Sequence, residues 1–206
     1  MPVDRSHVSA LVLAAGASSR MGEPKALLDL ADEPALARML RVLRDVPIDH
    51  VVVVLRDVTP KLRRAVALEH VTTAINVAPD GGQLTSLRIG LANLAATSDA
   101  FLVCPVDVPL FEAADVRALL DAWHSRDEGR SIVVPSHGGK RGHPALFARA
   151  LKDEFLALQD GEPANVVVRK DPSRVVHVTL DNEWLVRDLD TPQDRDAAAV
   201  AARARR

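Results

Sequence analysis

The chain has 206 residues, of which 48% are hydrophobic and 26% are charged, values typical of one globular domain. Its formal net charge of −2 gives no general attraction for nucleic acid or anionic membranes, so an anionic ligand would need a local site. Aromatic residues make up only 3%, which argues against base-stacking surfaces for single-stranded nucleic acid. We therefore expect a single domain over residues 1–206 with neither nucleic acid nor membrane as a partner.

Apolar strands alternate with amphipathic helices through the first two thirds of the chain. The expected strands cover 7–13, 51–55, 71–76, 100–104 and 131–134, and the expected helices between them cover 34–44, 60–68, 83–94 and 113–124. Strands that are apolar on both faces suit a parallel sheet covered by helices, and the rhythm implies right-handed βαβ units. The pattern predicts an α/β fold with a mostly parallel sheet.

The rhythm loosens after residue 134. We expect a loop over 138–142, a short strand over 143–147, helical segments over 149–158 and 163–170, a strand over 175–180, and an edge strand over 184–189. Thr191 as N-cap and Pro192 at the first helical position predict a last helix. Its alanine- and arginine-rich end, within 194–206, is expected to fray.

The stretch from Leu11 to Lys25, LVLAAGASSRMGEPK, runs from a buried strand into a loop of small residues. Backbone N–H groups in such a loop, with Arg20 and Lys25 nearby, suit the phosphates of a nucleotide. Taken singly, a glycine turn after a strand and surface cations are also common structural features. The stretch contains no GxGxxG and does not close with Gly-Lys-Ser/Thr, so it matches neither a dinucleotide fingerprint nor a P-loop.

Two carboxylates are expected at the same edge of the sheet, where ligands of such folds collect. Asp107 lies between Pro105 and Pro109 just past a buried strand. It could hydrogen-bond its own loop, or it could hold Mg²⁺ together with phosphate oxygens. Asp190 would share a face with Asp188 if a strand continued through both, and could instead serve as the entry charge of the last helix.

Five short motifs, in order along nearly the whole chain, are those of a known family. The first motif covers residues 13–16, 18–22, 24 and 25. The other four cover residues 83–88, 105–110, 142–147 and 188–192. On these motifs the chain resembles the MobA-like nucleotidyltransferases related to the molybdenum-cofactor cytidylyl- and guanylyltransferases, most closely the cytidylyltransferase-like branch. The resemblance implies a three-layer Rossmann-like nucleotidyltransferase fold with a mixed, mostly parallel sheet and one NTP-transferase domain.

The resemblance also implies a reaction and a site. The reaction is Mg²⁺-dependent transfer of a nucleoside monophosphate from an NTP, with CTP favoured, to a phosphorylated acceptor, expected to be a molybdopterin-type cofactor, with release of pyrophosphate. The implied donor residues are Leu13, Ala14, Ala15 and Gly16 for the base and ribose, Gln83 and Ser86 for the base, Arg20 for the β- and γ-phosphates, and Lys25 for the α-phosphate. Asp107 and Asp190 would hold Mg²⁺, and Arg20, Lys25 and Asp107 would be catalytic. Lys140, Arg141 and His143 would contact the acceptor, although a loop with two cations is more often a solvated turn.

Two alternatives stay open at this point. One is a nucleotidyltransferase for a sugar phosphate or another small phosphorylated acceptor. The other is a non-catalytic nucleotide-binding accessory protein that inserts a cofactor. The family context suggests a molybdoenzyme or accessory protein as partner and a monomer or small homo-oligomer as assembly.

Cys104 and the start of the chain bear on the compartment. A single cysteine excludes an internal disulfide and a cysteine-based metal cluster, and its place in an apolar run predicts core packing. The first residues, MPVDRSH, show no signal-peptide pattern, and no apolar run approaches the ~20 residues of a membrane span. The cytoplasm is the expected location.

Overall fold

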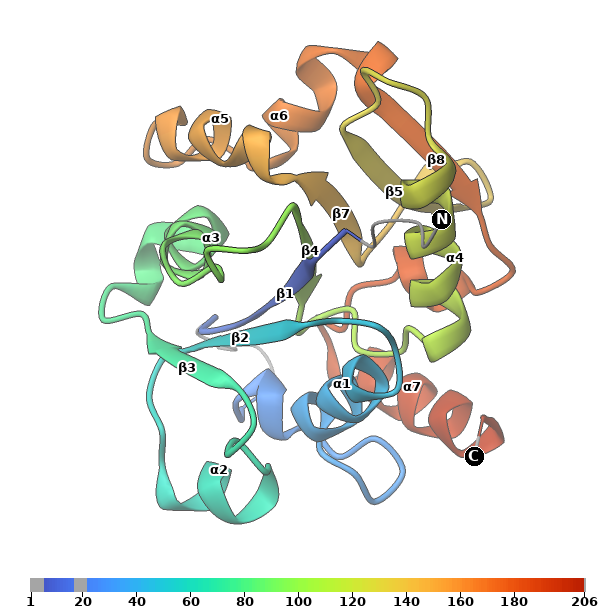
Figure 1. Cartoon of the computed structure of the whole chain (residues 1–206). Helices are drawn as coiled ribbons and strands as arrows, with labels where there is room; N and C mark the ends of the chain where they lie inside the picture. Colours follow the sequence, from blue (N-terminus) through green and yellow to red (C-terminus); the bar gives the residue numbers. More distant parts are fainter. Residues whose placement is uncertain (1–5, 17–21, 206) are drawn as a thin grey trace.

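One mixed sheet, flanked by helices on both faces, organises the protein. The structure is a computed structural model that describes residues 6–16 and 22–205 (Figure 1). Within these residues eight strands form the sheet, in the order β3-β2-β1-β4-β7-β5-β6, with β8 beside β5. The strands are β1 (Val8–Ala14), β2 (His50–Leu55), β3 (Thr72–Ile75), β4 (Ala100–Pro105), β5 (Ile132–His137), β6 (Lys140–Arg141), β7 (Ala145–Ala148) and β8 (Val175–Thr179).

Strand pairing is parallel in the first half of the chain and mixed in the second. β1 lies parallel to β2 and β4, and β2 lies parallel to β3. β7 is antiparallel to β4 and β5, whereas β8 runs parallel to β5. Because β1 and β4 are parallel neighbours, the segments that follow them, which contain Gly16 and Asp107, start at the same edge of the sheet.

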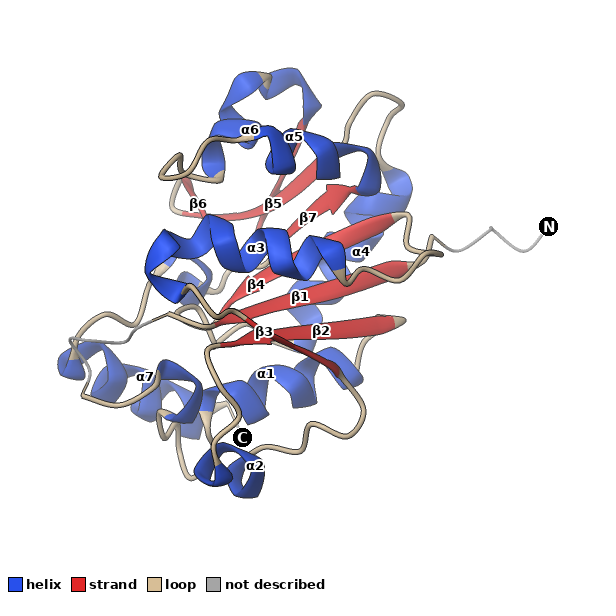
Figure 2. Cartoon of the chain, turned by 90° about the vertical axis from the view of Figure 1, so that its left-hand side faces the viewer, coloured by secondary structure: helices blue, strands red, loops and turns tan. Residues whose placement is uncertain are grey.

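The helices form two layers, one on each face of the sheet. Figure 2 shows α3 (Gly82–Ala92) with α5 (Lys152–Ala157) and α6 (Asn165–Lys170) on one face. The other face carries α1 (Ala35–Arg44), α2 (Pro60–Ala65), α4 (Ala113–Ser125) and α7 (Pro192–Ala204). The expected three-layer α/β fold with a mixed, mostly parallel sheet is therefore confirmed.

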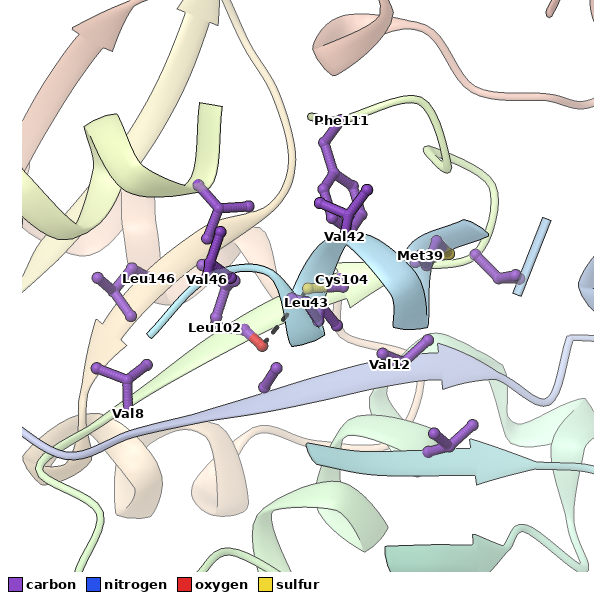
Figure 3. Close-up of a cluster of buried hydrophobic side chains, with 14 of the residues drawn as sticks. Val8, Val12, Met39, Val42, Leu43, Val46, Leu102, Cys104, Phe111 and Leu146 are labelled. Atoms are coloured by element: carbon purple, nitrogen blue, oxygen red, sulfur yellow. Dashed lines mark hydrogen bonds between the residues drawn. The ribbon is translucent and has the colours of Figure 1, made fainter. Parts of the chain in front are cut away.

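A separate apolar core fills the space on each side of the sheet. Under α3 and α5, the side chains of Leu87 and Phe155 pack against the strands. On the opposite face, Met39 of α1 and Trp123 of α4 belong to the second core (Figure 3). Cys104 lies in that second core with 1% of its surface exposed, so its expected role in core packing is confirmed.

Cys104 should be chemically inert in the folded protein. Burial raises the pKa of its thiol, and the thiolate is the form that reacts. We expect Ellman's reagent at pH 8 to leave the native chain unlabelled and to label one thiol per chain in guanidinium chloride. The Cys104→Ser variant should be unlabelled in both conditions, and rapid labelling of the native wild type would contradict the buried position.

The edge strand expected over 184–189 is wrong, because Glu183–Val186 forms a 3₁₀ helix instead. The Asn182 side chain accepts a hydrogen bond from the N–H of Trp184 and starts that turn. The backbone N–H of His143 donates to the carbonyl of Leu185 at 2.8 Å, which ties the 3₁₀ helix to the segment before β7. Trp184 and Leu185 are buried as part of this 3₁₀ helix rather than as part of a strand.

The loop expected over 138–142 is also partly wrong, since Lys140 and Arg141 form β6, a hairpin partner of β5. Gly138 and Gly139 close the hairpin with φ values of 55° and 77°, a region that glycine adopts without strain. At Gly142 a Cβ atom would collide with the carbonyl of the neighbouring 3₁₀ helix. Glycine at this position therefore permits the close approach.

The last helix begins as expected and ends more firmly than expected. The Thr191 hydroxyl accepts from the N–H of Asp194, whose carboxylate accepts from the N–H of Thr191, so α7 starts with a capping box. At the other end, Arg205 donates to the carbonyl of Leu110 at 3.1 Å and to the side chain of Asn182 at 2.9 Å. The helix end is held through Arg205 rather than frayed.

A membrane-spanning helix is not found in the described part of the chain. None of the helices within residues 6–16 and 22–205 is both long and apolar enough to cross a bilayer.

Candidate active site

Lys25, Asp107 and Asp190 meet at the carboxyl edge of the sheet. Lys25 opens the 3₁₀ helix Lys25–Leu27, and its Nζ lies 2.7 Å from Oδ1 of Asp190. The same Nζ lies 3.9 Å from Oδ2 of Asp107. The Lys25 side chain is only 16% exposed, so its ammonium is held between the two carboxylates. Three residues that lie far apart in the sequence thus form one charged cluster.

The backbone fixes this convergence. Asp107 follows β4 directly, and the N–H of Val106 continues the β1–β4 ladder by donating to the carbonyl of Leu13 at 3.0 Å. The N–H of Leu189 donates to the carbonyl of Asp107 at 2.8 Å. That bond holds Asp188 and Asp190, the residues on either side of Leu189, beside the end of β4. The capping box at the start of α7 then fixes where the 188–190 segment turns away.

Negative charge exceeds positive charge in the cluster. Burial, assisted by Asp190, raises the pKa of Asp107 even though Lys25 opposes the shift. Burial also raises the pKa of Asp188, and its neighbours Asp107 and Asp190 raise it further. Among the described residues, three carboxylates therefore share one ammonium group, an arrangement that favours binding of a further cation.

The carboxylate oxygens of the cluster are suitable ligands for Mg²⁺ bound together with phosphates. Asp107 and Asp190 both approach the Lys25 ammonium, so their oxygens already face one cationic centre. Within residues 6–16 and 22–205, no group of three or more His, Cys, Asp or Glu side chains is placed to hold a metal alone. Mg²⁺ commonly takes one or two carboxylates and completes its shell with substrate phosphates and water.

A cavity of about 560 Å³ lies between α3 and the α5–α6 segment. The N-terminal part of α3 forms one wall, with Gly82, Leu84 and Leu87, and residues 161–165 contribute to another. Its apolar lining includes Phe147 and Phe155, whose rings meet edge to face with centroids 5.1 Å apart. The volume is in the range of small-molecule pockets.

His143 connects the cavity to the charged cluster. It lines the cavity, and the charge of Asp188 acts on its ring. Burial lowers the pKa of His143 overall, so the imidazole is neutral at pH 7. Its Nδ1 is buried and has no hydrogen-bond partner among the described residues. His143 therefore contributes a neutral ring to the cavity lining, and its Nδ1 is enclosed by the protein.

The structure separates the two cations expected to contact the acceptor. Both residues are exposed, but Arg141 belongs to the cavity lining and Lys140 does not. The reason is that successive side chains of a strand such as β6 point to opposite faces. Arg141 and His143 thus lie together at the cavity, and Lys140 lies apart from them.

The residues expected to bind the donor are only partly gathered at the cavity. Leu13 and Gln83 line it. Ala14 and Ala15 continue from β1 toward Gly16 at the same edge, and Arg20 lies outside the described residues. Ser86 is 5% exposed, and its hydroxyl accepts from the Asn76 amide at 3.0 Å. That bond joins α3 to the end of β3, while the part of Ser86 in base recognition stays a prediction.

Sequence reasoning missed several residues of the site. Asp188 belongs electrostatically to the charged cluster, and the DLDTP motif was the signal that could have included it. Glu162, Asn165 and Arg169 place polar groups on the cavity lining. They carry no local motif, and only the folding of α5 and α6 over the sheet brings them there.

Comparison with known proteins gives the same fold and family. Residues 10–176 match the MobA-like NTP transferase domain. The chain is 30% identical over 203 residues to the probable molybdenum cofactor guanylyltransferase of Opitutus terrae, covering 95% of this chain and 96% of that protein. The structure of Rv0371c from Mycobacterium tuberculosis H37Rv matches with a TM-score of 0.82 and 25% identity, over 95% of this chain and 99% of that one. Its complex with manganese matches with a TM-score of 0.79 and 25% identity, over 95% of this chain and 100% of that one.

The fold and the chain-wide match define an α/β nucleotidyltransferase. Within that class, the chain belongs to the MobA-like NTP transferase domain family. The resemblance to the MobA-like nucleotidyltransferases is therefore confirmed, while the assignment to the cytidylyltransferase-like branch stays a prediction.

Proposed function

We propose that this nucleotidyltransferase moves a nucleoside monophosphate from an NTP to the phosphate of a molybdopterin-type cofactor and releases pyrophosphate. The observation that carries the proposal is the convergence of Lys25, Asp107 and Asp190 next to a cavity that His143 lines. The name of the Opitutus terrae relative supports the acceptor class. Arg141 and His143 on the cavity lining would contact the acceptor, whereas Leu13 and Gln83 of the lining, together with the loop after β1, would contact the donor.

Charge neutralisation is the main task of these residues. The acceptor phosphate must attack the α-phosphate of the NTP, so two anions have to approach each other. The barrier falls through positioning and through cations placed where charge accumulates. The ammonium of Lys25 would sit at the α-phosphate, and Arg20 would stabilise the departing pyrophosphate. A nucleophilic side chain is not required.

Asp107 and Asp190 would hold Mg²⁺, which supplies further charge neutralisation at the phosphates when bound. The similarity to Rv0371c, whose structure was solved in complex with manganese, supports the proposal that this chain binds a divalent ion. Lys25, placed between these carboxylates, would be fixed in direction before the substrates arrive. This preorganisation is what a charge-stabilising site needs.

The donor base has two candidates. The name of the Opitutus terrae relative favours GTP. The resemblance of the five motifs taken together to the cytidylyltransferase-like branch favours CTP. A thermal-shift panel of the four NTPs with Mg²⁺ separates them, because ligand at 100 times its Kd adds about 2.7 kcal/mol to stability. We expect one of these two nucleotides to give the largest shift, and equal shifts from all four would count against base selection.

A comparison of different phosphorylated acceptors tests the reaction itself. Purified protein, Mg²⁺ and the selected NTP should release pyrophosphate when the molybdenum cofactor is added and not when a hexose 1-phosphate is added. Release with the sugar phosphate alone would favour the sugar-phosphate alternative. Nucleotide binding without pyrophosphate release from any acceptor would favour a non-catalytic accessory protein.

Arg141 and Lys140 provide a matched pair for the acceptor side of the site. Arg141→Ala should raise the acceptor KM about tenfold, the scale of one lost charge-assisted hydrogen bond, and leave the NTP KM unchanged. Lys140→Ala, next in sequence but outside the cavity lining, should leave both KM values near those of the wild type. Equal effects of the two substitutions, or a rise in the KM of both substrates, would refute the assignment.

A further inference from the structure

Arg88 joins the helix on one side of the cavity to the loop on the other. It lies on α3, directly after the cavity residue Leu87. Its Nη1 lies 2.5 Å from Oδ1 of Asp160, and its Nη2 donates to the carbonyl of Leu158. Both partners belong to residues 158–164, which we call the 158–164 loop and which connects α5 to α6.

The 158–164 loop forms part of the cavity wall. Its Gly161, Glu162, Pro163 and Ala164 belong to the lining. Gly161 has a φ of 87°, and the loop closes on itself where the N–H of Gln159 donates to the Glu162 carboxylate at 2.6 Å. The loop is thus a compact turn, and its position relative to α3 sets the distance between two walls of the cavity. Figure 2 shows α5 and α6 beside α3 on the same face of the sheet.

The contacts of Arg88 suit positioning better than general stabilisation. Asp160 is 92% exposed, and ion pairs with such an exposed partner contribute little to stability. The guanidinium is nevertheless only 27% exposed, and two of its nitrogens bind two points of one loop. A planar fork with two fixed partners restricts both the distance and the orientation of what it holds.

We infer that Arg88 is a positioning residue for the acceptor: it holds the 158–164 loop against α3 and so sets the width of the acceptor cavity without touching substrate. The inference rests on the proposed function in one respect, the assignment of the acceptor to the part of the cavity lined by Arg141, His143 and the 158–164 loop. Arg88 lies on α3, the helix that carries the expected donor residues Gln83 and Ser86, and it would control how the acceptor is bound. Loss of the two contacts that Arg88 makes with this loop should therefore weaken acceptor binding and leave donor binding unchanged.

The experiment compares Arg88→Ala and Arg88→Lys with a control, Arg117→Ala. Arg117 also donates to a backbone carbonyl, that of Asp45, and lies in α4 on the opposite face of the sheet. Hydrogen exchange of the ligand-free proteins should show faster exchange in Arg88→Ala at residues 158–164 and unchanged exchange in the core strands. Arg88→Lys, which has one nitrogen to offer, should lie between Arg88→Ala and wild type.

Kinetics and binding provide the second readout. Arg88→Ala should raise the acceptor KM about tenfold, with kcat and the NTP KM within about twofold of wild type. A merely destabilised protein would lose kcat through a lower active fraction, with KM unchanged. The Kd of the molybdenum cofactor alone, from quenching of protein fluorescence, should rise by the same factor.

The possible results are distinguishable. Unchanged exchange in the 158–164 loop of Arg88→Ala, or faster exchange with unchanged acceptor KM and Kd, would overturn the inference. A similar acceptor defect in Arg117→Ala would also overturn it. If wild type neither binds the molybdenum cofactor nor transfers to it, the proposed function fails and takes the acceptor role with it, while the exchange result still decides whether Arg88 holds the loop.

Discussion

Replacing Lys25 with alanine is expected to lower turnover at least ~100-fold, the scale seen when one preorganised charge-stabilising group is lost. The ammonium of Lys25 lies 2.7 Å from Asp190 and 3.9 Å from Asp107, so it is the positive charge at the centre of an acidic cluster. Its removal leaves the attacking and the attacked phosphates without that charge. It also leaves the carboxylates without their ammonium partner.

The measurement is kcat at saturating NTP, acceptor and Mg²⁺, with nucleotide binding followed separately by calorimetry. Lys170→Ala is a matched control, because Lys170 is a largely exposed lysine that pairs with Glu154 on the face carrying α5 and α6. It should retain wild-type turnover. Wild-type turnover in Lys25→Ala would show that the cluster has a structural role only.

Asp107→Asn should also lower turnover at least ~100-fold, since it removes one of two carboxylates proposed to hold the metal while keeping the side chain's shape. Mn²⁺ titration followed by electron paramagnetic resonance, with NTP present, should show weaker binding in Asp107→Asn and unchanged binding in Asp196→Asn. Asp196 is an exposed aspartate of α7 that pairs with Arg195. Tight Mn²⁺ binding and full turnover in Asp107→Asn would exclude Asp107 as a ligand.

The same substitution should make the metal-free protein more stable. The pKa of Asp107 is raised in the folded chain, chiefly by burial, so its ionised form costs stability at every pH above that pKa. Below the ordinary aspartate pKa of about 3.9 the group is protonated in both states and the difference disappears. Thermal unfolding at pH 8 without metal should therefore give a higher Tm for Asp107→Asn than for wild type. A lower Tm would mean that the pair with Lys25 outweighs the burial.

The sequence predicted well the parts of the fold that depend on local periodicity. β1, β2 and β4 are strands made mostly of apolar residues, and α7 starts at the Thr191-Pro192 signal that marks helix beginnings. The carboxylate pair was also placed correctly, because Asp107 and Asp190 both lie beside Lys25. The parallel pairing of β1 and β4 accounts for the position of Asp107. Asp190 follows a 3₁₀ helix rather than a strand, and the hydrogen bond from the N–H of Leu189 to the carbonyl of Asp107 brings it to this edge.

Other features depend on contacts between distant segments. The segment expected as an edge strand begins instead with a 3₁₀ helix over residues 183–186, because Asn182 caps it and His143 binds its backbone. Lys140 and Arg141 looked alike in sequence, and only the β5–β6 hairpin assigns one of them to the cavity. Arg88 meets its partners 70 and 72 residues further along the chain. No local pattern encodes such a pair.

The fate of the NTP phosphates is the most direct test of the proposed reaction. Wild-type protein with Mg²⁺ and the molybdenum cofactor would be incubated in parallel with NTP labelled at the α-phosphate and NTP labelled at the γ-phosphate. We predict that the α label appears in the cofactor and the γ label in pyrophosphate, with both transfers lost in Lys25→Ala. Appearance of the γ label on the cofactor, or release of the α label as free nucleoside monophosphate, would contradict nucleotidyl transfer at this site.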